Sequence, residues 1–178
     1  MALLPIHVYG SPILRKKLDP IEELPADFDR ILTDMWETMY DDEGIGLSAN
    51  QVGLDLRFFI ADLSLRDKNL KREVFINPEI IAAEGEILDE EGCLSLPGIR
   101  EQIPRAAKII LRYETSERQV VERGFSDYLA RVVQHEVDHL DGMFTFDRVS
   151  ALKRSFLKSK LSRLSARAAK GEFAKDID

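Results

Sequence analysis

Apolar residues recur at helical spacing in three stretches of the chain. The spacing predicts helices over residues 27–42, 127–141 and 149–170. In the second helix the apolar stripe passes through Leu129, Val132, Val133, Val137 and Leu140. At about 100° per residue, Glu136 falls within this stripe and Asp138 points the opposite way. A carboxylate on an apolar face indicates a chemical role for that residue.

Five short segments are rich in β-branched and aromatic residues, which is typical of strands. They cover residues 57–62, 74–77, 79–83, 108–113 and 119–125, with Gly, Pro, Asn or charged turns between them. This order favours small antiparallel sheets over βαβ units. Four prolines in residues 1–25 predict an extended arm laid over the domain. We therefore expect an α+β fold, with small antiparallel sheets around the central helix 127–141, an N-terminal helix and a C-terminal helix.

The composition is that of an ordinary globular protein, with 44% hydrophobic and 32% charged residues among 178. Nothing divides the chain into unlike halves, so we expect a single domain over residues 1–178. No basic leader and no run of roughly 18 apolar residues is present, which predicts a cytoplasmic protein without a membrane partner. The net charge of −7 argues against a DNA-binding role. The single cysteine, Cys93, excludes an internal disulfide.

His135 and His139 lie one turn apart on the predicted helix, so they can bind one metal ion, with Glu136 beside them to handle protons. The alternative is a structural metal site or two surface histidines. His7 lies in the proline-rich arm without a partner motif, so we expect a packing or surface role for it.

A catalytic metal normally takes three protein ligands. A thermolysin-like peptidase would use a downstream glutamate, but the next one is Glu172, beyond the last helix. The metzincin pattern places Thr145 where its third histidine belongs, and a zinc deaminase needs a second cysteine. Cys93 remains, because a thiolate is a strong ligand for zinc or ferrous iron. An inert buried thiol is the alternative for that cysteine.

Three motifs follow one another along the chain: GIGLSANQ at residues 44–51, EGCLS at 91–95 and QHEVDH at 134–139. Together they resemble the motifs of bacterial peptide deformylases, and the similarity extends from the proline-rich arm to the last helix. Ser48 stands where the family usually has alanine, a small-for-small change. Tyr128 and Arg131 are more polar than the residues of some relatives, which bears on the shape of the side-chain pocket.

The resemblance implies a metal-dependent hydrolase that removes the formyl group from the N-terminal formyl-methionine of new polypeptides and releases formate. It implies roles for nine residues: metal ligation by Cys93, His135 and His139, acid-base catalysis by Glu136, an oxyanion hole from the Gln51 amide and the Leu94 N–H, and substrate contact by Ile45, Gly46 and Gly92. Asp138 is expected to matter far less to catalysis.

The cofactor implied by the resemblance is one divalent ion, Fe²⁺ in the cell, with Zn²⁺, Ni²⁺ or Co²⁺ able to occupy the site. Ligand chemistry alone favours zinc. Two other classes of protein stay open at this point: a divergent metallopeptidase that cuts internal amides, and a metal-stabilised binding module without turnover.

Charge is unevenly placed along the chain. Residues 148–171 hold eight basic residues and no acidic one, leaving 17 of the 25 basic residues against all 32 acidic ones elsewhere, a balance of −15. We expect Val149, Leu152, Phe156 and Leu164 to dock the last helix on the body, with its cations in water. Cations on one helix can meet phosphates, and the resemblance points the same way, so weak ribosome contact through this helix is predicted.

Overall fold

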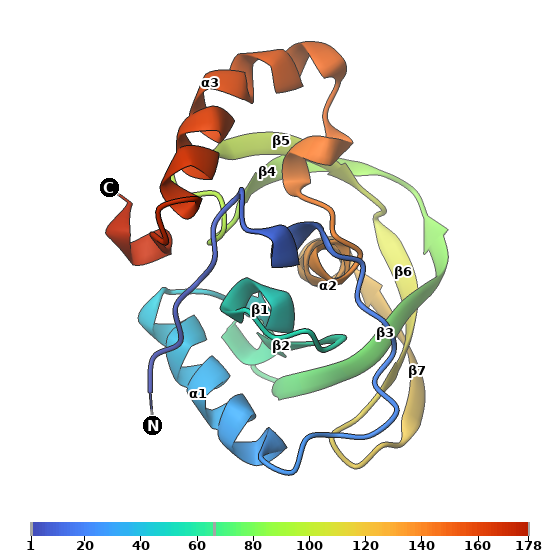
Figure 1. Cartoon of the computed structure of the whole chain (residues 1–178). Helices are drawn as coiled ribbons and strands as arrows, with labels where there is room; N and C mark the ends of the chain where they lie inside the picture. Colours follow the sequence, from blue (N-terminus) through green and yellow to red (C-terminus); the bar gives the residue numbers. More distant parts are fainter. Residues whose placement is uncertain (1, 66, 178) are drawn as a thin grey trace.

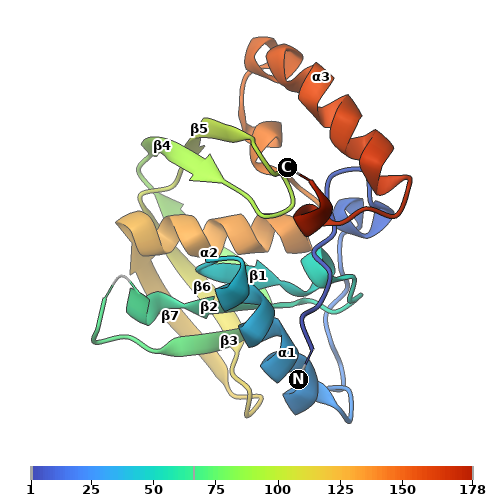
Figure 2. The same ribbon diagram turned by 90° about the vertical axis from the view of Figure 1, so that its left-hand side faces the viewer.

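The computed structural model describes residues 2–65 and 67–177, and one helix, α2 (Asp127–Leu140), runs through its centre (Figure 1). Helix α2 lies between two antiparallel sheets (Figure 2). The larger sheet has the order β1-β2-β3-β6-β7, formed by β1 (Gly46–Ser48), β2 (Phe58–Asp62), β3 (Arg72–Glu84), β6 (Lys108–Glu114) and β7 (Val120–Ser126). The smaller sheet is the hairpin of β4 (Ile87–Gly92) and β5 (Arg100–Arg105). The expected α+β class is confirmed.

Two further α-helices flank this centre, α1 (Phe28–Asp41) and α3 (Ala151–Ala168). All three predicted helices are confirmed to within two residues at each end. Short 3₁₀ helices complete the described elements: η1 (Pro12–Arg15), η2 (Ala49–Val52), η3 (Leu63–Leu65), η4 (Thr145–Arg148) and η5 (Ala174–Asp176). Within the described residues, every helix is too short or too polar to cross a bilayer.

Strand β2 is buried on both faces because a helix covers each side of it. Phe58 and Ile60 point to the side of α1, where they join one apolar cluster. Phe59 and Ala61 belong to the cluster that includes α2. Successive side chains of a strand point to opposite faces, so the unbroken apolar run in the sequence marks a strand between two helices.

The predicted segments 74–77 and 79–83 form one strand, β3, rather than two. Asn77, with φ of +51°, produces a bulge between them and shifts the register with β6. Its side chain supports the bulge, since Asn77 Nδ2 donates to Ile21 O at 2.9 Å. The sequence did not predict β1, β4 or β5, because the first is short and the other two are rich in charged residues.

Helix α3 docks through a different stripe from the one expected. Val149 and Leu164 are buried, as predicted, but Leu152 and Phe156 are 68% and 75% exposed, so their predicted packing role is wrong. The buried face is supplied instead by Leu157, Leu161 and Leu164, which pack with Leu14, Phe144 and Phe146.

The proline-rich arm reaches the C-terminal end of α2. Leu18 N donates to Leu140 O at 2.9 Å, and Arg15 NH1 donates to Gly142 O at 3.3 Å. Gly142 ends α2 as expected, with φ of +71°. A Cβ at Gly142 would lie 2.6 Å from Arg15 O, so only glycine lets the arm approach this closely. Residues distant in sequence thus close the end of the central helix.

Candidate metal centre and active site

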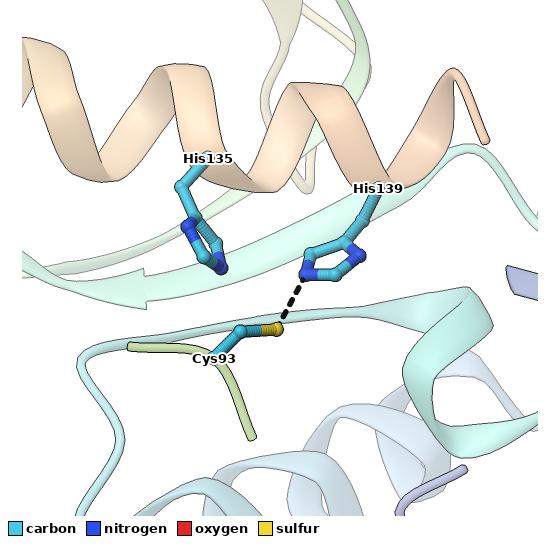
Figure 3. Close-up of side chains that lie close together, drawn as sticks. All are labelled: Cys93, His135 and His139. Atoms are coloured by element: carbon cyan, nitrogen blue, oxygen red, sulfur yellow. Dashed lines mark hydrogen bonds between the residues drawn. The ribbon is translucent and has the colours of Figure 1, made fainter. Parts of the chain in front are cut away.

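Three side chains of ligand type meet beside α2 (Figure 3). His135 and His139 lie one turn apart on α2, and Cys93 lies in the turn that follows β4. One nitrogen or sulfur atom from each lies within 4.8 Å of the other two, and Cys93 Sγ is 3.1 Å from His139 Nε2. His7 lies outside this group, with its Nδ1 2.9 Å from Ser11 Oγ. The structure therefore brings together the residues predicted as metal ligands in a group that could hold one ion.

Glu91 holds the ring of His135 in place. His135 Nδ1 is 3.0 Å from Glu91 Oε2, so a neutral imidazole that donates through Nδ1 keeps Nε2 free for a metal. Burial would raise the pKa of Glu91, but hydrogen bonds from Arg105 and His135 outweigh it and hold that pKa well below its usual range. Glu91 lies in the EGCLS motif, but nothing in its sequence position indicates this role.

A buried ionic network extends from Glu91 to Arg148 at the end of η4. Arg105 donates to both Glu91 oxygens at 2.9 Å and also to Asp138. Asp138 also pairs with a second cation, because Arg148 Nε donates to its Oδ2 at 2.6 Å. The side chains of Arg105, Glu91 and Asp138 are only 1%, 6% and 7% exposed. Asp138 is therefore a structural ion-pair partner rather than a solvated residue on the far face of α2.

Arg131 belongs to the same network and is not a free polar group in the pocket. Its NH1 donates to Glu91 Oε1 at 2.7 Å and to Ile103 O at 2.9 Å, while NH2 donates to Ile87 O at 2.7 Å. Tyr128, one turn earlier, is partly exposed and lines the cavity. The charge that made Arg131 unusual in the sequence is thus used to bind the β4–β5 hairpin to α2.

Glu136 lies under β1 with its carboxylate against Gly46. A Cβ on Gly46 would meet Glu136 Oε1 at 2.5 Å, so glycine is required here for the carboxylate to fit. Glu136 is 4% exposed, and its Oε2 has no hydrogen-bond partner within the described residues. Burial raises the pKa of Glu136 to about 7. A carboxyl group with such a pKa can both accept and donate a proton near neutral pH.

The Gln51 side chain has a fixed orientation. Its Oε1 accepts from Ser48 N at 3.0 Å and Ser48 Oγ at 2.9 Å. Its Nε2 then faces the metal side, donating to Ser95 Oγ at 3.2 Å and lying 3.9 Å from Cys93 Sγ. The Leu94 N–H donates to no acceptor within the described residues, so it is available to a ligand. Ser48 and Ser95 had no role in the sequence analysis.

A cavity of about 770 Å³ opens beside these groups. Eight of the nine predicted site residues line it: Ile45, Gly46, Gln51, Gly92, Cys93, Leu94, His135 and Glu136. The ninth, His139, is 1% exposed and lies beside Cys93, one turn after His135 (Figure 3).

The model of the polypeptide deformylase family matches residues 3–155. The peptide deformylase of Thermodesulfovibrio yellowstonii is 43% identical over 160 residues, which cover 90% of this chain and 97% of the relative. Peptide deformylase 2 of Xanthomonas campestris is 42% identical over 172 residues, covering 95% of this chain and 100% of the relative. The chain belongs to the polypeptide deformylase family. It is a hydrolase that removes the N-formyl group from nascent peptides.

The fold agrees with this family membership. The crystal structure of peptide deformylase from Thermus thermophilus superposes with a TM-score of 0.85 at 40% identity, covering 93% of this chain and 99% of that one. The deformylase family thus accounts for the α+β fold, and the Cys-His-His group is consistent with a metalloenzyme.

Replacing Asp138 with alanine should destabilise the protein, because it leaves Arg148 unpaired and Arg105 with fewer acceptors in a buried place. We expect a loss on the order of 3 kcal/mol in the free energy of unfolding, measured by urea denaturation. Asp55→Ala is the control, since Asp55 pairs with Lys16 at the surface and should cost less than about 1 kcal/mol. Equal losses in the two variants would contradict the structural role of Asp138.

Gly46→Ala should displace the Glu136 carboxylate without moving the ligand group. The variant is expected to keep its bound metal but to lose about 10²-fold or more in kcat, the range for a misplaced acid-base group. Metal content and formyl-peptide turnover are measured together. Gly124→Ala is the control, because its Cβ would be 4.0 Å from the nearest atom, Ile109 O. Normal turnover by Gly46→Ala would contradict the requirement for glycine beside the Glu136 carboxylate.

Proposed function

We propose that this chain hydrolyses the formamide of N-terminal formyl-methionine on nascent polypeptides, as a single catalytic domain over residues 1–178 in the cytoplasm. The observation that carries the proposal is the convergence of Cys93, His135 and His139 within 4.8 Å, beside the buried carboxylate of Glu136. The formyl C–N bond breaks, and the products are formate and a free amino terminus. Neither DNA nor a membrane takes part.

The three ligand residues fit a divalent metal ion. One thiolate and two neutral imidazoles suit zinc or ferrous iron and leave a coordination position open. We propose Fe²⁺ in the cell, on the family resemblance, with Zn²⁺, Ni²⁺ or Co²⁺ able to occupy the site. When bound, such an ion supplies Lewis acidity that lowers the pKa of a water molecule. The fixed ring of His135 supports this ligand set, because Glu91 leaves its Nε2 free.

Glu136 carries the proton in this proposal. Its carboxylate accepts a proton from the water that attacks the formyl carbon, then donates it to the departing amine nitrogen. Two observations support the role: the pKa of Glu136 is raised by burial to about 7, and its Oε2 has no hydrogen-bond partner within the described residues.

Gln51 and Leu94 stabilise the negative charge that develops on the formyl oxygen. The serine contacts that fix the Gln51 amide direct its Nε2 toward the side of Cys93, and the Leu94 N–H follows Cys93 directly. Hydrogen-bond donors that are already oriented stabilise the transition state more than mobile donors do, because they need not reorganise during the reaction.

Ile45, Gly46 and Gly92 bind the peptide backbone. Strand β1 is the outermost strand of its sheet, and Gly92 ends β4 on the far side of the same cavity. A substrate in extended conformation can therefore add as a strand along β1.

The decisive experiment compares Cys93→Ala and Glu136→Ala. Cys93→Ala should lose both activity and most bound metal, because two histidines hold a divalent ion weakly. Glu136→Ala should keep its metal and fold but lose about 10²- to 10⁴-fold in kcat. Metal content is measured by elemental analysis of protein purified without oxygen, which also identifies the ion. Full metal occupancy in Cys93→Ala would refute the ligand assignment.

Two controls separate the proposal from the other classes of protein. A formyl-methionyl peptide and its unformylated form distinguish deformylation from cleavage of internal amides. Glu23→Ala, a change at an exposed glutamate, should leave kcat unchanged. Metal binding without turnover by the unmodified protein would favour a binding module.

We also propose that α3 makes weak contact with the ribosome. Lys153, Lys158 and Arg163 on α3 are exposed and enter none of the ion pairs found in the described part of the chain. Their positive charge is available to phosphates. The exposed Leu152 and Phe156 lie on the same helix and offer apolar area to a partner.

Replacing these three cations with glutamine should abolish co-sedimentation with ribosomes at low salt, because each phosphate contact contributes to a salt-sensitive affinity. Circular dichroism checks that α3 still folds. A control protein carries the same change at three exposed lysines outside α3: Lys17, Lys71 and Lys108. Co-sedimentation that is absent at low salt, or equal in the two variants, would leave α3 as a packing element only.

A further inference from the structure

Helix α3 supplies one side chain to the catalytic cavity. Lys160 is exposed on α3, yet it is among the residues that line the cavity. Its Nζ donates to Gly98 O at 3.3 Å, in the turn that joins Cys93 to β5. No ion pair found in the described part of the chain involves Lys160. A cation without a carboxylate partner therefore stands at the mouth of the active site.

A second cation of the cavity lining, Arg100, lies at the start of β5, two residues after Gly98. Arg100 is the register partner of Gly92, and its Cζ would be 3.4 Å from a Cβ built on that glycine. Its ion pair with Glu90 is long, 3.6 Å, between side chains that are 70% and 54% exposed. Such a pair is weak, so the guanidinium can exchange Glu90 for another anion.

The charges of the cavity lining are unevenly placed. Asp42 and Glu43 come from the connection between α1 and β1. On the hairpin side, Lys160 and Arg100 lie with one exposed carboxylate, Glu90, whereas Glu91 and Arg131 are buried and paired with each other. Asp42 also has a cation of its own, Lys175, at 3.8 Å. The charges that a peptide meets therefore differ between the β1 side of the cavity and the hairpin side.

We infer that Lys160 and Arg100 form a subsite for an acidic side chain within the first three residues after the formyl-methionine. The inference rests on the proposed deformylation at this site. A peptide that lies along Gly92 passes beside Arg100, and its side chains point alternately to the two sides of the backbone. A carboxylate on the hairpin side meets both cations, whereas a lysine there is repelled.

The subsite should act on binding rather than on the chemical step, because neither cation belongs to the metal-ligand group or to the proposed proton-transfer and oxyanion groups. An acidic residue should lower KM and leave kcat unchanged, since the interaction is equal in ground state and transition state. For a partly exposed charge pair we expect an advantage of about two- to fivefold in kcat/KM. The advantage should shrink at high ionic strength.

The test uses formyl-Met-Ala-Ala-Ala and versions with aspartate or lysine at the second, third or fourth position. The unmodified enzyme should favour aspartate over lysine in at least one of these positions at low salt. Lys160→Glu should remove or reverse that preference through KM, and Arg100→Glu should do the same. Lys108→Glu is the matched control, because it changes the net charge equally at an exposed lysine of β6 that does not line the cavity.

Each outcome decides one of the two proposals. Equal kcat/KM for aspartate and lysine peptides, or a preference that survives in both Lys160→Glu and Arg100→Glu, would overturn the subsite. A preference lost equally in Lys108→Glu would reduce it to an effect of overall charge and overturn it too. Failure to deformylate even the neutral alanine peptide would instead refute the proposed function.

Discussion

The carboxylate of Glu91 joins the two sides of the site, because it accepts hydrogen bonds from hairpin residue Arg105 and from His135 and Arg131 of α2. A buried carboxylate without partners would be strongly destabilising, so the hairpin and the helix are stable only together. The turn that carries Cys93 begins two residues after Glu91. The same interaction therefore sets both the ring of one ligand and the position of another.

Helix α2 has two different environments, and they explain its unusual sequence. One face packs on the large sheet through apolar residues such as Val133, Val137 and Leu140. The other face is covered by the β4–β5 hairpin, so its polar side chains are buried as well and need partners. Gln134 illustrates this, since it accepts from Ala106 N at 3.0 Å and donates to Ala106 O at 3.0 Å. Two buried polar atoms of α2 have no hydrogen-bond partner within the described residues, Glu136 Oε2 and His139 Nδ1, and both belong to the candidate site.

Local spacing in the sequence was sufficient to predict the three helices, because each repeats its apolar residues over several turns. Spacing also selected His135 and His139, whereas Cys93 was selected because other third ligands were excluded and it is the single cysteine. Spacing did not reveal the buried ionic network beside these residues, since Arg105 and Arg148 reach Asp138 of α2 from other elements and have no regular spacing relative to the helix. The hairpin was missed because β4 and β5 are rich in charged residues, and its buried pair, Glu91 with Arg105, forms between two strands with no local sequence signal. The inward face of α3 was misjudged because Leu152 and Phe156 share helical spacing with residues that do dock.

The end of α2 has a consequence for the order of folding. The carbonyl of Leu140 is bonded by Leu18 and Arg57, and that of Gly142 by Arg15 across a separation of 127 residues. Contacts between segments so distant in sequence close slowly, because much chain entropy is lost before they form. The turn of α2 that carries His139 is completed by these contacts. The end of the ligand-bearing helix therefore depends on contacts that form late in folding, and a growing chain that lacks α2 has no metal site of its own.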